Sequence, residues 1–196
     1  ALSQPGIPDL YVAGDNPGLG ATTADYFKKA LPDGGNIVVL RGLPIPIDKQ
    51  RVDAFMAGIK DSKIKVLDSQ FANWNRDDGY KIMQDFLTKY PNIDAVWAQD
   101  DDTLVGVLKA LKEAGRDDKI WAVGGAGMNQ IVKMVEAGSK QVPVDVSYNP
   151  NMVATAIDLT TLHFVANAQV DGTMIINSTL ITKDNAKDFD YANTPF

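Results

Sequence analysis

Short apolar runs alternate with amphipathic segments along most of the chain. Six runs rich in β-branched and aliphatic residues recur at spacings of roughly 25 to 30 residues, the length of a βα unit. They occupy positions 10–13, 36–40, 63–67, 95–98, 120–123 and 142–146. Between them, apolar residues recur at helical spacing, as in the stripe formed by Val52, Phe55, Met56 and Ile59. The pattern predicts strands and helices in alternation.

Glycine and proline residues mark the places where the predicted helices end. Turn-forming residues stand at 33–35, 91–92, 114–115 and 137–138, each shortly before the next apolar run. Strands that alternate with helices over short connections form a parallel sheet, because each connection returns over a face of the sheet by a right-handed crossover. We therefore predict an α/β fold, with a doubly wound parallel sheet that carries helices on both faces.

The pattern changes after Tyr148. Asn149 and Pro150 open a long predicted helix that ends near residue 168, and a strand-like run follows at 173–182. The apolar surface of these two elements needs a partner that the remaining tail, rich in Asp, Asn and Lys, does not supply. We therefore predict one complete lobe over residues 15–148, with residues 1–14 and 149–196 forming part of a second lobe.

Polar and aromatic side chains follow several of the predicted strands. Ligands of open parallel sheets bind outside the carboxyl ends of the strands, so these side chains are candidates for a binding site. They are Asp15, Asn16, Arg51, Trp74 and Asp100. A sugar or polyol presents hydroxyl groups, which pair with carboxylates, amides and guanidinium groups, and C–H faces, which pack on an aromatic ring. The five residues therefore predict a site for a small polyhydroxylated ligand.

Each of these residues also has an ordinary structural interpretation. Asp15 and Asn16 are typical of the first residues of a helix, and at least one of the three acids at 100–102 is expected to cap a helix. Arg51, taken alone, is typical of a solvated helix residue. Trp74 could belong to a core, although its polar neighbours make an apolar environment a poorer fit. The sequence leaves both interpretations open.

Composition and charge exclude several classes of function. The chain has 25 acidic and 19 basic residues and a net charge of −6, with no basic stripe that would bind nucleic acid. The absence of cysteine excludes disulfides, thiolate metal sites and cysteine nucleophiles. A Mg²⁺-dependent enzyme using residues 100–102 and the glycine-rich segment 124–127 is a further hypothesis, but the chain lacks a Walker lysine and a nucleophile with an attendant base. We predict a binding protein without cofactor or metal, not an enzyme, and a tight turn at 124–127.

Three segments resemble the ribose- and galactose-type periplasmic binding proteins of ABC importers. They are Val-Ala-Gly-Asp-Asn at 12–16, Ser-Gln-Phe-Ala-Asn-Trp-Asn-Arg at 69–76 and Ala-Val-Trp-Ala-Gln-Asp-Asp at 95–101, and the resemblance extends over nearly the whole chain. It implies the type I periplasmic binding protein fold, in which two lobes clamp a sugar. It also implies a membrane permease as partner, a chemoreceptor as a further partner, and a periplasmic location, with a signal peptide that is not in this chain.

The resemblance also implies ligand contacts at Arg51, Trp74, Asp100, Ala126 and Tyr148. Asp100 stands where similar ribose binders have an amide, and Ala126 stands where they have a carboxylate. These two differences change which hydroxyl groups find partners, and they favour a related aldose, a polyol or another small polyhydroxylated solute over ribose itself. Tyr148 lies where the pattern changes, so hinge packing is an equal interpretation for it.

The resemblance further indicates that the first part of the N-terminal lobe is missing from this chain. We therefore expect a fragment of a longer protein, or a second polypeptide that supplies the rest. The alternative to an importer component is the effector-binding core of a lactose-repressor-type transcriptional regulator, which has the same fold. That class requires an N-terminal helix-turn-helix, which these residues do not contain.

Overall fold

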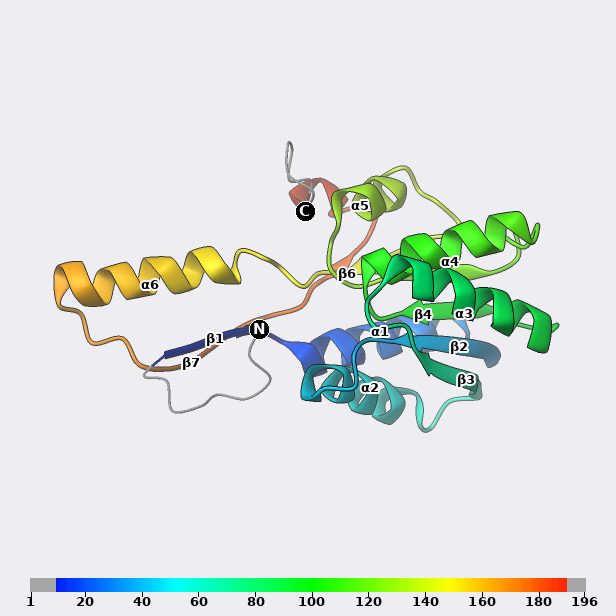
Figure 1. The fold of residues 1–196 in the computed structure, drawn as a ribbon, viewed down its shortest axis with the longest axis horizontal. Helices are drawn as coiled ribbons and strands as arrows, with labels where there is room; N and C mark the ends of the chain where they lie inside the picture. The colour runs from blue at the N-terminus through cyan, green and yellow to red at the C-terminus, as the bar shows by residue number, and fades with distance from the viewer. Residues whose placement is uncertain (1–9, 190–196) are drawn as a thin grey trace.

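The computed structural model describes residues 10–189. Its centre is a four-stranded parallel sheet in the order β3-β2-β4-β5 (Figure 1). The strands are β2 (Gly35–Arg41), β3 (Ile64–Phe71), β4 (Ala95–Ala98) and β5 (Trp121–Val123). All three pairings are parallel, which confirms the predicted α/β architecture.

Helices cover both faces of this sheet. They are α1 (Asn16–Ala30), α2 (Pro46–Ile59), α3 (Arg76–Lys89), α4 (Asp101–Glu113) and α5 (Asn129–Glu136). Alternate residues of β2 enter different cores: Ile37 and Val39 pack with α1 and α2, while Val38 and Leu40 pack with α3 and α4. Because side chains alternate along a strand, a continuous apolar run is what a sheet covered on both faces requires.

Aromatic side chains fill the core on the α1 and α2 side. Phe55 stacks on Trp97 with ring centroids 4.3 Å apart, and Phe27 meets Phe55 edge to face at 5.5 Å. Trp121 extends the cluster, with its ring 4.7 Å from that of Phe27. Trp97 is fully buried within β4. The four rings form one aromatic cluster on this face of the sheet.

A smaller layer lies to one side of this lobe. It consists of β1 (Leu10–Gly14), which pairs in parallel with β7 (Gly172–Ile176), and α6 (Met152–Ala166) beside them (Figure 1). None of the α6 residues is buried. Several large apolar side chains of the layer are exposed: Val153, Ile157, Leu162, Phe164, Val165, Met174 and Ile175. The uncovered apolar surface is the one that the sequence pattern indicated.

The predicted single strand at 173–182 is wrong. Two short strands replace it, β7 and β8 (Leu180–Ile181), and β8 pairs in antiparallel fashion with β6 (Asp145–Val146). Ile181 and Ala186 are fully buried in the core of the large lobe, and η1 (Ala186–Phe189) packs on α5. The assignment of all residues after 148 to a second lobe is therefore wrong for residues 180–189, because their apolar side chains are covered by the large lobe.

Within the described residues, the chain passes between the large lobe and the smaller layer three times, near residues 14–16, 147–150 and 176–179 (Figure 1). Hydrogen bonds join these crossings. The Asp15 amide donates to the Ile176 carbonyl over 2.9 Å, and the Ser178 hydroxyl donates to the Asp15 carbonyl over 3.0 Å. The Thr179 amide donates to Ser147 Oγ over 2.9 Å. The three crossings thus form one hydrogen-bonded unit.

Among residues 10–189, no helix has the length and apolar character that a membrane span requires.

Candidate ligand-binding site

A cavity of about 410 Å³ opens at the carboxyl ends of the strands, between the large lobe and the first turn of α6. Its wall combines charged, aromatic and small residues: Ile47, Arg51, Trp74, Asp100, Gly125, Ala126, Tyr148, Pro150, Met152 and Val153. Five of the seven predicted ligand residues therefore meet around one space, namely Arg51, Trp74, Asp100, Ala126 and Tyr148. Asp15 and Asn16 do not line it.

Arg51 is the cation of the cavity, and two hydrogen bonds fix its guanidinium. Its Nε donates to Asn16 Oδ1 over 2.9 Å, and its Nη1 donates to the Gln99 carbonyl over 3.0 Å. Its Cζ atom lies 4.7 Å from the ring centroid of Tyr148 and 5.5 Å from that of Trp74. Burial lowers the pKa of Arg51, and the nearby Tyr148 and Asp100 oppose that shift. A guanidinium has five N–H donors, so this fixed group retains donors for a ligand.

Asn16 and Asp15 act behind the cavity wall. Asn16 is buried in the first turn of α1, and its amide oxygen holds Arg51 in place. Asp15 is the N-cap of α1, where its Oδ1 accepts from the Gly18 amide over 2.8 Å. Its side chain borders a separate hollow of about 280 Å³ beside Gln50. The structure thus gives Asp15 the capping role and gives Asn16 a supporting one.

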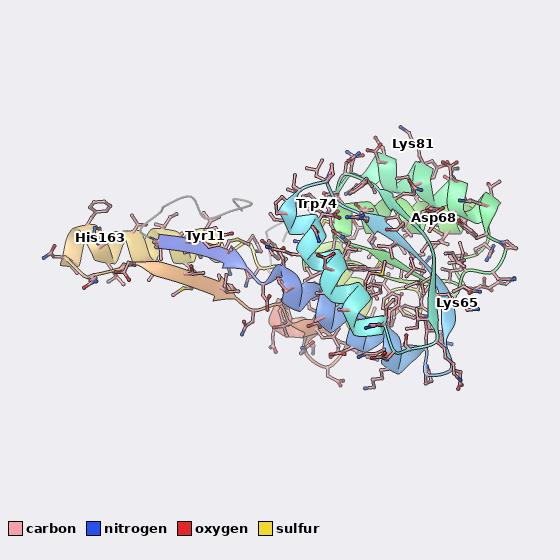
Figure 2. All side chains as sticks on the ribbon, turned by 90° about the horizontal axis from the view of Figure 1, so that it is seen from below. Tyr11, Lys65, Asp68, Trp74, Lys81 and His163 are labelled. Atoms are coloured by element: carbon pink, nitrogen blue, oxygen red, sulfur yellow. The ribbon has the colours of Figure 1, made fainter. Side chains whose placement is uncertain are left out.

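Trp74 provides an aromatic plate at the cavity. Both Asn73 and Trp74 have left-handed backbone conformations, with φ of 57° and 52°. Such angles are uncommon for residues with a side chain, so two in succession mark an unusual turn at this position. The ring lies directly against Gly42, where an added Cβ would come within 1.9 Å of it. Figure 2 shows Trp74 on the side of the lobe that faces α6, far from Lys65.

Asp100 both caps a helix and borders the cavity. Its Oδ1 accepts from the Thr103 amide over 2.9 Å at the start of α4. Burial raises the pKa of Asp100, and the hydrogen bond from the Thr103 amide and the charge of Arg51 act against that rise. Because the cap bond uses Oδ1, the second carboxylate oxygen can accept from a ligand hydroxyl. The capping and ligand interpretations are therefore compatible for this residue.

Several residues of the cavity were not anticipated from the sequence. Ile47, Pro150, Met152 and Val153 are apolar or small, and nothing in their spacing separates them from ordinary packing residues. The glycine-rich segment is not the tight turn that the sequence predicted: it bends at Gly125, Ala126 forms a parallel β-bridge with Ser147, and Gly127 has a φ of +88°. The lone His163 lies exposed on α6, far from Trp74 (Figure 2), and it does not line the cavity. Among residues 10–189, no group of three or more His, Cys, Asp or Glu side chains is placed to hold a metal ion.

The fold combines an α/β lobe, with a cavity at its strand ends, and a smaller layer, and comparison with known proteins identifies the family. The model described as "Periplasmic binding protein domain" matches residues 3–165, so the chain belongs to this family. The type I periplasmic binding protein fold predicted from the sequence is confirmed by the same match and by solved structures.

Individual relatives are named for sugars. The chain is 31% identical over 173 residues to the D-allose-binding periplasmic protein of Escherichia coli, covering 87% of this chain and 54% of that protein. It is 33% identical over 129 residues to the ribose import binding protein of Salmonella typhimurium, covering 65% and 43%. A solute-binding protein of Actinobacillus succinogenes, solved with bound D-allose, superposes with a TM-score of 0.83 and 25% identity over 91% of this chain and 63% of that one. The chain thus spans about half the length of the curated relatives.

Proposed function

We propose that this chain is part of the solute-binding component of a bacterial ABC importer and that its cavity binds a sugar or a polyol. The observation that carries the proposal is the convergence of Arg51, Asp100 and Trp74 on one cavity at the carboxyl edge of the sheet. A cation held by two hydrogen bonds, a carboxylate with a free oxygen and an aromatic plate are the groups that a polyhydroxylated ring needs. Membership of the periplasmic binding protein family supports the same conclusion.

The composition of the cavity narrows the class of solute. Arg51 and Asp100 are its charged side chains, and the Arg51 guanidinium lies over the rings of Tyr148 and Trp74. The remainder is apolar or small, including Ile47 and Ala126. A neutral solute with both hydroxyl and C–H groups fits this combination of charged and apolar lining residues. Ala126 offers no partner to a hydroxyl. A related aldose or a polyol is therefore favoured over a charged solute.

The exposed apolar side of the smaller layer fits a site that is completed by further protein. Phe164 and Val165 are 79% and 82% exposed, and they lie on a helix that buries none of its residues. Contiguous exposed apolar surface of this kind marks an interaction site. The relatives have about twice the matched length, so we infer that additional residues of the same lobe cover α6 and supply the opposite wall of the cavity. Solute capture is then a closure of two lobes about the crossings.

The location and the partners follow from the same proposal. A solute-binding component of an importer acts in the periplasm and delivers its solute to a membrane permease, and a chemoreceptor is a second partner for the closed form. The alternative, an effector-binding core of a lactose-repressor-type regulator, shares the fold. The relatives described above are import or periplasmic binding proteins, which supports the importer component.

Isothermal titration calorimetry tests the binding function. D-ribose, D-allose, xylitol and myo-inositol are titrated into this chain and into the complete gene product. We expect micromolar or tighter binding of at least one solute by the complete product, with weaker binding by this chain. Arg51→Ala and Trp74→Ala should abolish it, whereas Lys81→Ala on the exposed face of α3 should not change it. Equal binding by wild type and Arg51→Ala, or no binding of any solute by the complete product, would count against the proposal.

A further inference from the structure

Asp101 is buried behind the cavity and holds the loop that forms one of its walls. The residue is 1% exposed at the start of α4. Its Oδ1 accepts from the Gly125 amide over 3.0 Å, and its Oδ2 accepts from the amides of Gly127 and Met128 over 3.1 and 2.7 Å. Gly125 and the neighbouring Ala126 line the cavity. One carboxylate therefore fixes the backbone of this wall through three hydrogen bonds.

A second buried carboxyl group lies against the first. Asp145 is fully buried in β6, and its Oδ2 also accepts from the Gly127 amide, over 3.1 Å. The two groups flank Gly124, where an added Cβ would lie 2.0 Å from Asp101 Oδ1 and 3.1 Å from Asp145 Oδ1. Two ionised carboxylates this close in a buried site repel strongly, so a pair of this kind retains a proton.

In the described part of the chain, no Lys or Arg forms an ion pair with either carboxyl group. Asp100 adds a further negative charge near Asp101, and Arg51 from α2 acts on Asp100. Asp102 points outward and pairs with Arg76 from α3. Burial is the largest cause that raises the pKa of Asp101 and of Asp145, and the charge of Asp101 raises the pKa of Asp145 further.

We propose that Asp101 and Asp145 are positioning residues of the cavity, which share one proton, fix the loop of residues 124–128, and make solute binding weaken when that proton is lost. The proposal rests on the proposed binding function. In the singly protonated pair, Asp145 donates to Asp101, and Asp101 keeps its negative charge for the three loop amides. Loss of the shared proton leaves two buried anions beside the same Gly127 amide, and their repulsion displaces the loop. Gly125 and Ala126 then no longer hold their places in the wall.

The Asp145→Asn variant separates this role from a merely structural one. An asparagine amide can donate to Asp101 as the protonated acid does, but it does not titrate. Asp101→Asn removes the charge that the loop amides face. Asp102→Asn changes an exposed acid of the same helix turn and is the matched control. Amide resonances of Gly125, Gly127 and Met128 in this 196-residue chain are followed by NMR from about pH 5 to about pH 9.

We expect the three amides to titrate together in the wild type and in Asp102→Asn, with a midpoint above the ordinary range of an aspartate, and to stay constant in Asp145→Asn. The pH dependence of solute affinity is measured in parallel, with whichever of D-ribose, D-allose, xylitol and myo-inositol binds best. Affinity should fall by about tenfold or more over the titration in the wild type, since one unit of pKa coupling is tenfold in binding. It should stay flat in Asp145→Asn and be low throughout in Asp101→Asn.

Two results would overturn the proposal: loop amides that do not titrate in the wild type, or a pH profile of affinity that is the same in the wild type and in Asp145→Asn. If none of the four solutes binds at any pH, the proposed function fails. The amide titration still decides in that case whether Asp101 and Asp145 hold the loop through a shared proton. The two failures are therefore distinguishable.

Discussion

The side-chain oxygen of Asn16 accepts a hydrogen bond from Nε of Arg51 over 2.9 Å, and the bond joins the first turn of α1 to α2 beneath the cavity. Both residues are about 5% exposed. The direction of the guanidinium toward the cavity therefore depends on a residue that does not line it.

Replacement of Asn16 by alanine should weaken solute binding and stability together. It leaves a buried guanidinium donor without its partner, which costs about 1 to 3 kcal/mol. We expect a loss of solute affinity of about tenfold or more, measured by calorimetry, with a lower free energy of urea unfolding. Asn92→Ala, at an exposed position, is the control. Unchanged affinity in Asn16→Ala would show that Arg51 does not need this support.

Gly42→Ala should displace Trp74. An added methyl group would overlap the indole, whose nearest ring atom lies 1.9 Å from the position of the new Cβ. Overpacking of this kind costs about 1 to 3 kcal/mol in stability, and the ring must move to relieve it. Solute affinity should fall, while the exposed neighbour Leu43→Ala should bind as the wild type does. Wild-type binding by Gly42→Ala would contradict the role of Trp74 as a fixed plate.

Asp48 should contribute far more to stability than a surface acid of the same helix. It is 1% exposed, pairs with Arg41, and accepts from the Gly42 amide over 3.0 Å. Asp48→Ala leaves the half-buried Arg41 guanidinium without its partner and the Gly42 amide without its acceptor, so it should cost about 1 to 3 kcal/mol in urea unfolding. Asp53→Ala removes an exposed pair with Lys49 and should cost less than about 1 kcal/mol. Similar losses of unfolding free energy for Asp48→Ala and Asp53→Ala would contradict the larger structural role of Asp48.

The stability of the wild type should fall as pH rises above the ordinary range of aspartate. The pKa values of Asp101 and Asp145 are raised in the folded protein, so the unfolded chain releases these protons first. The stabilisation is complete below about pH 4 and is lost as pH rises through the raised values, by about 1.4 kcal/mol for each unit of difference. Urea unfolding at several pH values should show this slope reduced in Asp145→Asn. If the free energy of unfolding fell equally with pH in the wild type and in Asp145→Asn, the raised pKa of Asp145 would not be the cause.

Hydrogen exchange should separate the large lobe from the smaller layer. Amides of α6 should exchange much faster than those of α4, because α6 buries none of its residues, whereas Leu104, Val107 and Leu111 of α4 are fully buried. Mass spectrometry of this chain after deuterium labelling measures the difference. In the complete gene product, covering of Phe164 and Val165 should slow exchange in α6. Fast exchange of α6 in both proteins would argue against a covering lobe.

The fold of the large lobe was predictable because its strands are buried on both faces. Continuous apolar runs, such as the one around Val38 and Val39, indicate a covered parallel sheet without knowledge of the rest of the chain. The end of the chain was not predictable in the same way. Leu180 and Ile181 form a two-residue strand, and nothing in so short a run shows which lobe covers it.

The candidate site was predictable for polar and aromatic residues that follow the ends of strands. Arg51, Trp74 and Asp100 are polar or aromatic residues near strand ends, and all three line the cavity. Asn16 has the same features but faces Arg51, because a sequence shows which strand end a residue follows and not which neighbour it meets. Asp145 lies far along the chain from Asp101, and a contact between them depends on the order of the strands.

The hydrogen bonds among the three crossings also couple the smaller layer to the cavity. Because Asp15, Ser147 and the 176–179 segment are bonded to one another, rotation of the smaller layer strains all three crossings at once. Tyr148 follows Ser147 directly and lines the cavity, and its amide donates to the Ala126 carbonyl over 2.9 Å. Hydrogen bonds therefore connect the three crossings directly to the wall of the cavity. A substitution at Ser178, which does not line the cavity, should alter the rate at which a bound solute escapes.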